Sequence, residues 1–309
     1  KQFASQANFP PRLTYLITLA GAAEMLRSGT TAVLDHFWMA ATLTREGLDA
    51  AMQAYEDSGM RASVAPMIED QDLVVEQARR HRASLLNRYP LEDDHLSTSE
   101  QLEIVHYLIT HWHHKSDDRL RCLPGPGGAQ WCSRNLLQGC LDLAERHATG
   151  IHIHMAETRL QSIVCRKAYG HSAVEELQKI GLLNPSCTLA HCIWLDDGDF
   201  NLLAESRATV VHNPVSNLKL GSGIANLPEM TKRNIKLALG TDGAASNDNQ
   251  NMFAVLKLTG LLHSPAIWDA NTWINAAQVI EMATVGGAKV LGYENLGHLQ
   301  AGALADIGL

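Results

Sequence analysis

The chain has 309 residues, enough for one large domain or two ordinary ones, and its hydrophobic fraction of 46% allows a sizeable buried core. Its formal net charge is −8 and it has no basic patch with interleaved aromatic residues, which argues against a nucleic-acid partner. No apolar run reaches the roughly 20 residues that a membrane-spanning helix needs, and no signal peptide is visible, so we expect no membrane partner.

Helical and strand patterns alternate along the chain. Residues 13–27 have helical periodicity and end at Ser28-Gly29, a common helix C-cap, and the β-branched run 30–35 follows as a buried strand. The further predicted helices are about 45–58, 70–88, 99–115, 133–148, 159–169, 171–181, 196–205, 227–233, 249–263, 272–283 and 285–291. The further predicted strands are 61–68, 119–126, 150–157, 187–192, 208–213 and 235–242.

This alternation predicts an α/β fold with a parallel sheet. The seven strand–helix units favour a (β/α)8 TIM-type barrel with one unit unseen, over a doubly wound open sheet, because no Gly-rich phosphate loop follows the first strand. No linker or low-complexity segment divides the chain, so we expect residues 1–309 to form one barrel domain. We expect it to be incomplete at both ends, because it lacks an initiator Met and stops within an apparent strand.

Polar side chains mark the ends of the predicted strands, where a barrel has its active site. They are His36, His154, His191, His212 and Asp242. Glu157 follows His154 by three residues, so a carboxylate lies near a histidine. Chance placement of the fifteen histidines would put few of them at these ends, so the pattern predicts a metal site. The alternatives are that His191 is a core histidine and that Asp242 caps a turn.

Two other histidines have competing interpretations. His152 shares a strand face with His154 but lies one pleat deeper, which favours a packing or supporting role over a ligand role. His212 precedes the turn-forming residues 213–217, so shaping the loop and contacting substrate are about equally favoured.

The six cysteines form no CxxC pair. In a chain of this length, that is typical of reduced thiols in a cytoplasmic protein. Cys192, which follows His191, is more typical of a core residue than of a nucleophile.

Four sequence blocks in the right order resemble the amidohydrolase superfamily. They are HMAET (154–158), LAHCIWL (189–195), VVHNPVSNLKLGSGIA (210–225) and LGTDGAASNDNQNMF (239–253). AEMLRSGTTAVLD (23–35) and GHLQAGALADI (297–307) also fit, so the resemblance covers nearly the whole chain. More narrowly, the blocks resemble the branch of aromatic-heterocycle deaminases and s-triazine hydrolases. That branch includes 8-oxoguanine, isoxanthopterin and methylthioadenosine/S-adenosylhomocysteine deaminases.

The resemblance implies a barrel with one catalytic divalent metal ion, most often zinc, with iron as the alternative. It implies that His154 and Asp242 are metal ligands, that Glu157 is the proton shuttle, and that His191 lies near the metal and its water. Glu157, His191 and Asp242 are thus the expected catalytic residues. The family's other two ligands form an HxH pair on the first barrel strand; that strand and the flanking small β-domain are not apparent here, and His152-x-His154 is not that pair.

The loop after the fourth barrel strand departs from the family pattern. The family's GPHAPYTCS reads GPGGAQWCS here, and Gly127 in place of histidine counts against methylthioadenosine-type deamination. Trp131 could stack on a flat ring and Gln130 could read its hydrogen-bonding edges; with His212 and Asn213 they are the candidate substrate-binding residues. Because DHFW (35–38) resembles the 8-oxoguanine and isoxanthopterin enzymes, we expect an oxidised purine or pterin.

We therefore expect a metal-dependent aminohydrolase that deaminates an aromatic N-heterocycle with metal-activated water. One alternative is a hydrolase of the same fold acting on another bond, by s-triazine dechlorination or cyclic amide hydrolysis. Another is a non-catalytic relative that lacks the HxH pair. The expected partners are a small heterocyclic substrate and further copies of the chain in a homo-oligomer.

Overall fold

The computed structural model describes residues 10–39, 43–81 and 96–308. Its strands form two parallel groups of four. The first group comprises β1 (Ala32–Phe37), β2 (Arg61–Ile68), β3 (Leu120–Cys122) and β4 (Gly125–Pro126). The second comprises β5 (Ile151–Met155), β6 (Cys187–His191), β7 (Thr209–His212) and β8 (Lys236–Leu239). A parallel bridge between Gly128 and His154 joins the two groups, so the strands follow one another in chain order.

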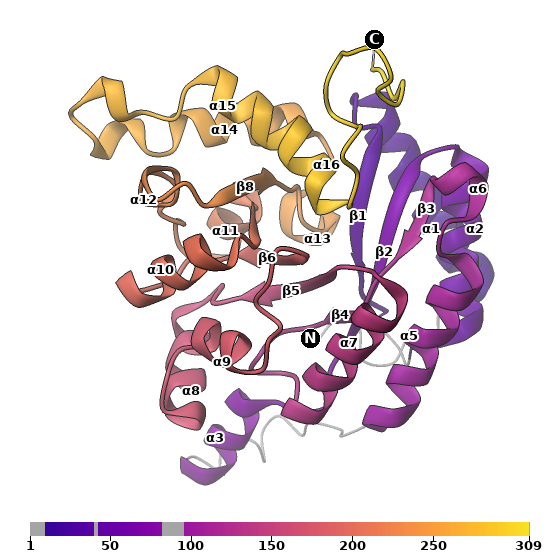
Figure 1. The fold of residues 1–309 in the computed structure, drawn as a ribbon, viewed down its shortest axis with the longest axis horizontal. Helices are drawn as coiled ribbons and strands as arrows, with labels where there is room; N and C mark the ends of the chain where they lie inside the picture. Colours follow the sequence, from indigo (N-terminus) through magenta and orange to yellow (C-terminus); the bar gives the residue numbers. More distant parts are fainter. Residues whose placement is uncertain (1–9, 40–42, 82–95, 309) are drawn as a thin grey trace.

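Helices surround the strands on the outside (Figure 1). They are α1 (Pro11–Arg27), α2 (Arg45–Ser58), α3 (Leu73–His81), α5 (Thr98–Trp112), α6 (Lys115–Asp118), α7 (Arg134–His147), α8 (Arg159–Tyr169), α9 (Ala173–Lys179), α10 (Asp197–Ser206), α11 (Pro214–Lys219), α12 (Leu227–Lys232), α13 (Ala244–Asn247), α14 (Met252–Leu261), α15 (Ala276–Glu281) and α16 (Gly287–Val290). A π-helix, 282–286, joins α15 to α16. This arrangement is the predicted α/β TIM-type barrel, in which β1 and β8 each pair on one edge only among the described residues. Residues 82–88 of one predicted helix lie outside the described residues.

Local signals in the sequence set the bounds of several helices. Thr44 caps α2 by accepting a hydrogen bond from the Gly47 amide, and Gly59 ends the helix with φ +75°. At α8, Thr158 and Gln161 form a reciprocal capping box. The capping box at Thr158 starts α8 shortly after the end of β5.

The predicted strand 119–126 is split into β3 and β4. Both pieces keep the same register on β2, because Cys122 pairs with Val64 and Gly125 pairs with Met67. Pro124 lies between them and has no N–H to donate to the ladder, which interrupts the strand. A Cβ on Gly125 would lie 2.6 Å from the Pro66 carbonyl oxygen, so the close approach of β4 to β2 requires glycine there.

The core lies between the strands and their helices. In β5 the apolar residues Ile151, Ile153 and Met155 belong to it, whereas His152 and His154 alternate with them on the other face. The six cysteines are free and buried, as predicted for reduced thiols. Among the described residues, no helix combines the length and the apolar character needed to cross a membrane.

We predict that Ile153→Ala lowers the free energy of unfolding by about 2–5 kcal/mol, because Ile153 is fully buried and the truncation leaves a cavity. The control is Ile163→Ala on α8, whose side chain is 51% exposed and whose loss should change stability by about 0.5 kcal/mol or less. Urea denaturation of the two variants measures both effects. Equal losses would contradict the placement of Ile153 in the core.

Candidate functional site

Three histidines from three strands stack at one end of the barrel. The rings of His36 and His154 lie 4.7 Å apart at an interplanar angle of 25°, and those of His154 and His191 lie 5.3 Å apart at 17°. Asp242 follows β8, and its Oδ2 lies 3.9 Å from His191 Nε2. The structure thus brings the predicted residues His154, His191 and Asp242 together although they are far apart in the sequence.

Hydrogen bonds define the tautomers of two of these histidines. His154 Nδ1 donates to the Gly127 carbonyl oxygen over 2.9 Å, and His191 Nδ1 donates to the Asn217 side-chain oxygen over 2.8 Å. Because both acceptors are oxygens without a proton to give, each Nδ1 carries a hydrogen, and Nε2 is the nitrogen that has the lone pair when the ring is neutral. Burial lowers the pKa of His154, which favours this neutral form.

Asp242 is held in an ionised, oriented state. Ser216 Oγ donates to its Oδ2 over 2.5 Å and the Gly243 amide donates to its Oδ1 over 2.7 Å. Burial alone would raise the pKa of this carboxyl group, but His191 and these hydrogen bonds outweigh it, so the pKa lies below its usual value. The residue has φ +62°, a left-handed conformation uncommon for a residue other than glycine.

Glu157 is held by two neutral donors. Gln161 Nε2 donates to one carboxylate oxygen over 3.3 Å, and Ser222 Oγ donates to the other over 3.2 Å. Gln161 also accepts a hydrogen bond from the Glu157 amide, so the cap of α8 and the orientation of the carboxylate depend on one side chain. Trp194 Nε1 donates to the Ser222 carbonyl oxygen and fixes the loop that carries the second donor.

His152 lies deeper than His154 and is buried. Its Nδ1 is hydrogen-bonded to Thr188 Oγ1 over 2.7 Å, and its ring meets that of His36 edge-on at 4.9 Å. Burial lowers its pKa well below the usual value, so the ring is neutral. His36 donates from Nε2 to the Gly125 carbonyl oxygen, and its Nδ1 is buried without a partner. His152 therefore has the environment of a packing residue beneath the site.

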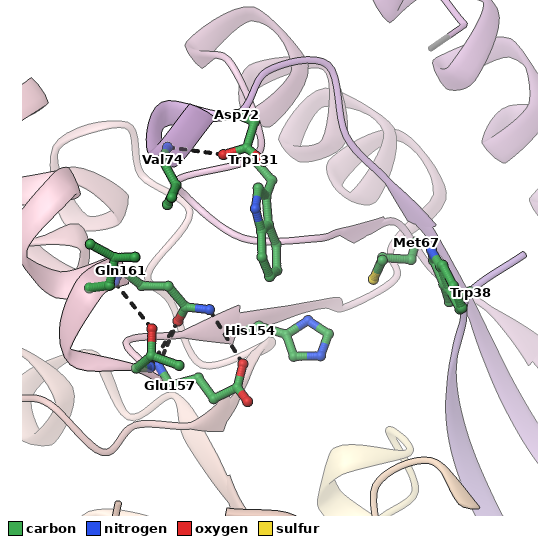
Figure 2. Close-up of a pocket in the computed structure, with 10 residues that line it drawn as sticks. Trp38, Met67, Asp72, Val74, Trp131, His154, Glu157 and Gln161 are labelled. Atoms are coloured by element: carbon green, nitrogen blue, oxygen red, sulfur yellow. Dashed lines mark hydrogen bonds between the residues drawn. The ribbon is translucent and has the colours of Figure 1, made fainter. Parts of the chain in front are cut away.

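A pocket of about 430 Å³ opens beside His154 and Glu157 (Figure 2). Its lining residues come from β2, β5, α3, α8 and the loops after β1, β2, β4 and β5. They are Trp38, Met67, Asp72, Val74, Trp131, His154, Glu157, Thr158, Leu160 and Gln161. Figure 2 shows Trp131 reaching into the space above His154, and its ring meets that histidine edge-on at 6.4 Å. The volume and the apolar walls suit a flat ring system.

The other predicted substrate residues lie outside this lining. Gln130 is buried, and its Nε2 has no hydrogen-bond partner. His212 and Asn213 are also buried, and neither ring nitrogen of His212 has a partner. Of the four candidate substrate-binding residues, Trp131 is the one that the structure places in the pocket wall.

The donors at the site fit part of a metal centre. His154 presents a free Nε2 and Asp242 an ionised carboxylate, which are donor types that zinc accepts. His191 Nε2 lies 3.9 Å from Asp242 Oδ2, so a cation or a proton near these two atoms would interact with both. No group of three or more His, Cys, Asp or Glu side chains that could hold a metal ion occurs within residues 10–39, 43–81 and 96–308.

Four residues that orient the side chains of this site by hydrogen bonds were not predicted from the sequence. Ser216, Asn217 and Ser222 contact Asp242, His191 and Glu157, and those contacts join residues 26 or more positions apart, which one sequence does not reveal. The fourth residue, Gln161, could have been predicted from the sequence, because Thr158-x-x-Gln161 is a capping-box pattern directly after the HMAE block.

Comparisons with known proteins agree on one family. The sequence model of the amidohydrolase family matches residues 2–309. The chain is 34% identical over 303 residues to a 5'-deoxyadenosine deaminase of Methanosarcina acetivorans, with 98% of this chain and 63% of the relative covered. It is 35% identical over 307 residues to a 5-methylthioadenosine/S-adenosylhomocysteine deaminase of Syntrophobacter fumaroxidans, with 99% and 63% covered.

Solved structures give the same picture of the fold. The atrazine chlorohydrolase TrzN of Arthrobacter aurescens TC1, complexed with zinc, superposes with a TM-score of 0.85 at 25% identity, with 96% of this chain and 64% of that chain covered. An adenosine deaminase of Xanthomonas campestris with bound zinc has a TM-score of 0.82 at 26% identity, with 98% and 62% covered. The chain therefore spans about 63% of the length of the curated relatives.

The buried environment of His212 generates a prediction for acid stability. Burial, with the repulsion of His263 and His191, lowers its pKa to about 3. The unfolded chain, in which a histidine has its ordinary pKa of about 6.5, therefore binds the proton first as the pH falls, and this residue destabilises the folded state below that pH. We predict that His212→Leu gains stability relative to the wild type by up to about 1.4 kcal/mol per pH unit between about pH 6.5 and 3.

Urea denaturation of the wild type and His212→Leu at several pH values measures this difference. His111→Leu, which replaces an exposed histidine, controls for the change to leucine itself. Parallel stability curves for the wild type and His212→Leu would show that His212 does not stay neutral in the folded protein.

Proposed function

The chain belongs to the amidohydrolase family, and from that premise we propose that the protein hydrolytically deaminates an aromatic N-heterocycle. The observation that carries the proposal is one pocket lined by His154, Glu157 and Trp131. His191 stacks on His154, and Asp242 lies 3.9 Å from His191. An aromatic side chain and two ionisable groups thus face the same space, with further ionisable groups beside them. The deaminase names of the relatives support the same reaction class.

One divalent metal ion, zinc in our proposal, would be held by His154 and Asp242 with ligands from outside the described residues, and it would lower the pKa of a water to about 7. His191 accepts a hydrogen bond from the attacking water at its free Nε2 and so orients it. Asp242 and Glu157 accept the protons that the water gives up. Glu157 passes its proton to the ring nitrogen as the water oxygen bonds to the amidine carbon. The C–N bond then breaks, and the amino group takes the second water proton, held by Asp242, and leaves as ammonia.

For the substrate we propose an oxidised purine or a pterin. Trp131 offers its ring to a bicyclic heterocycle, and the unpartnered amide nitrogen of Gln130 is our candidate donor to a ring oxygen. Gly127 stands where the methylthioadenosine-type pattern has a histidine. We assign the buried His212 and Asn213 to packing under the pocket. A 5'-substituted adenosine is the second candidate, because relatives at 34–35% identity carry such names.

A substrate panel tests the reaction and the substrate class. Full-length protein reconstituted with zinc is assayed for ammonia release from 8-oxoguanine, isoxanthopterin, 5'-deoxyadenosine and methylthioadenosine. We expect the highest kcat/KM on one of the first two compounds. Preference for the adenosines would assign the second candidate, chloride release from a chlorotriazine would assign a dechlorinase, and no turnover by metal-loaded protein would reject an enzymatic role.

We predict that Glu157→Gln lowers kcat by about 10²–10⁴-fold and leaves the metal content unchanged. Glutamine keeps the shape of the side chain and can still meet Gln161 and Ser222, but it has no carboxylate to carry a proton. Ammonia release and metal analysis measure the two quantities. Glu175→Gln, at a 44% exposed glutamate on α9, should keep the wild-type rate. An unchanged rate in Glu157→Gln would remove this residue from the mechanism.

We predict that Asp242→Asn weakens zinc binding by at least about tenfold and abolishes most turnover, because a neutral amide is a poor ligand for the cation. Zinc titration of the full-length protein measures affinity without reference to activity. Asp248→Asn, at a 77% exposed carboxylate on the same loop, is the matched control and should bind zinc like the wild type. Wild-type affinity in Asp242→Asn would show that Asp242 is not a ligand.

A further inference from the structure

We propose that Ser216, Asn217 and Ser222, here called the α11 clamp, are positioning residues that orient all three proposed catalytic side chains. Ser216 donates to Asp242, Asn217 accepts from His191, and Ser222 donates to Glu157. One short segment after β7 thus reaches the ends of β5, β6 and β8. The inference rests on the proposed function, but the geometry that carries it does not use the substrate.

The central contact of the α11 clamp is the bond between Asn217 and His191. Both side chains are 1% exposed, so water does not compete for this bond. The Asn217 side-chain oxygen can only accept, which keeps a proton on His191 Nδ1 and makes Nε2, 3.9 Å from Asp242 Oδ2, the nitrogen that has the lone pair in the neutral ring. The opposite tautomer would point an N–H at Asp242 and leave no acceptor for the attacking water.

The α11 clamp is itself internally braced. The Asn217 carbonyl oxygen accepts from the Ser222 amide over 2.9 Å, so the residue that orients His191 also holds the residue that orients Glu157. Pro214 begins α11, and Gly221, at φ +65°, reverses the chain after the helix. Ser216, Asn217 and Ser222 are all buried. A displacement at Asn217 is therefore transmitted to two of the three catalytic side chains.

The deciding experiment compares two variants of Asn217 in the full-length protein. Asn217→Leu has nearly the same size but no acceptor, whereas Asn217→Asp restores an acceptor oxygen. Thr259→Val, which removes another buried hydrogen bond on α14, controls for a general loss of stability. The readouts are kcat and KM on the best panel substrate, the thermal midpoint, and the His191 tautomer from imidazole ¹⁵N chemical shifts.

We expect Asn217→Leu to lose about 10–100-fold in kcat without a matching rise in KM, because outer hydrogen-bond partners orient the groups that act on the substrate. We expect its His191 to lose the Nδ1–H tautomer, and Asn217→Asp to recover both the tautomer and part of kcat. Thr259→Val should keep the wild-type kcat.

Two results would overturn the α11 clamp: wild-type His191 found as the Nε2–H tautomer, or Asn217→Leu with an unchanged tautomer and kcat. If Asn217→Leu fails to fold, Asn217→Asp and the wild-type tautomer still decide the question. A wild type that deaminates nothing on the panel would reject the proposed function separately, because the ¹⁵N measurement needs no turnover.

Discussion

The level carboxyl ends of the parallel strands are the constraint on which the rest of this structure depends. His154 pairs with Ala190 and Met155 with His191, so β5 and β6 end side by side; His212 pairs with Leu239 at the ends of β7 and β8. Side chains that follow these strands must therefore emerge at one edge, whatever their distance in the sequence.

The chain leaves these strands through strained backbone. Ala156, His191, Cys192 and Asp242 have φ values of +44°, +73°, +51° and +62°, although none of them is glycine. Such conformations cost on the order of 1–3 kcal/mol each and persist because the surrounding packing over-determines them. Here the surrounding packing is the fully buried apolar face of β5 and β6.

The sequence predicted the regular elements well where local chemistry decides them. The bounds of α2 and β2 agree with the prediction, since a left-handed glycine ends α2 and the mostly apolar segment RASVAPMI forms β2. Predicted strands ran two to three residues too far at β5 and β8, because the apolar pattern continues where the backbone has already turned. The short helix α11 was missed, because its Asn-Pro start and Ser-Asn residues also suit a turn.

The site was predictable as a set of side chains but not as a set of contacts. Strand ends gave His154, His191 and Asp242, which the structure brings together. The partner of His191 is 26 residues away, and only the three-dimensional arrangement shows that an amide oxygen meets its ring. Gln130 was expected to face the substrate because of its loop; its side chain is buried and lies close to Gly128, and its contact with substrate stays a prediction.

The two strand groups contribute different residues to the site. The loops after β1, β2 and β4 supply Trp38, Asp72 and Trp131 to the pocket wall, whereas His154, His191 and Asp242 lie at or after the ends of β5, β6 and β8. The halves are joined by backbone atoms, the Gly127 carbonyl oxygen and the Gly128–His154 bridge, and also by side chains, because the rings of His36 and Trp131 meet that of His154. A redesign of the pocket's shape must therefore keep the ring contacts of His154 while it changes the rest of the wall.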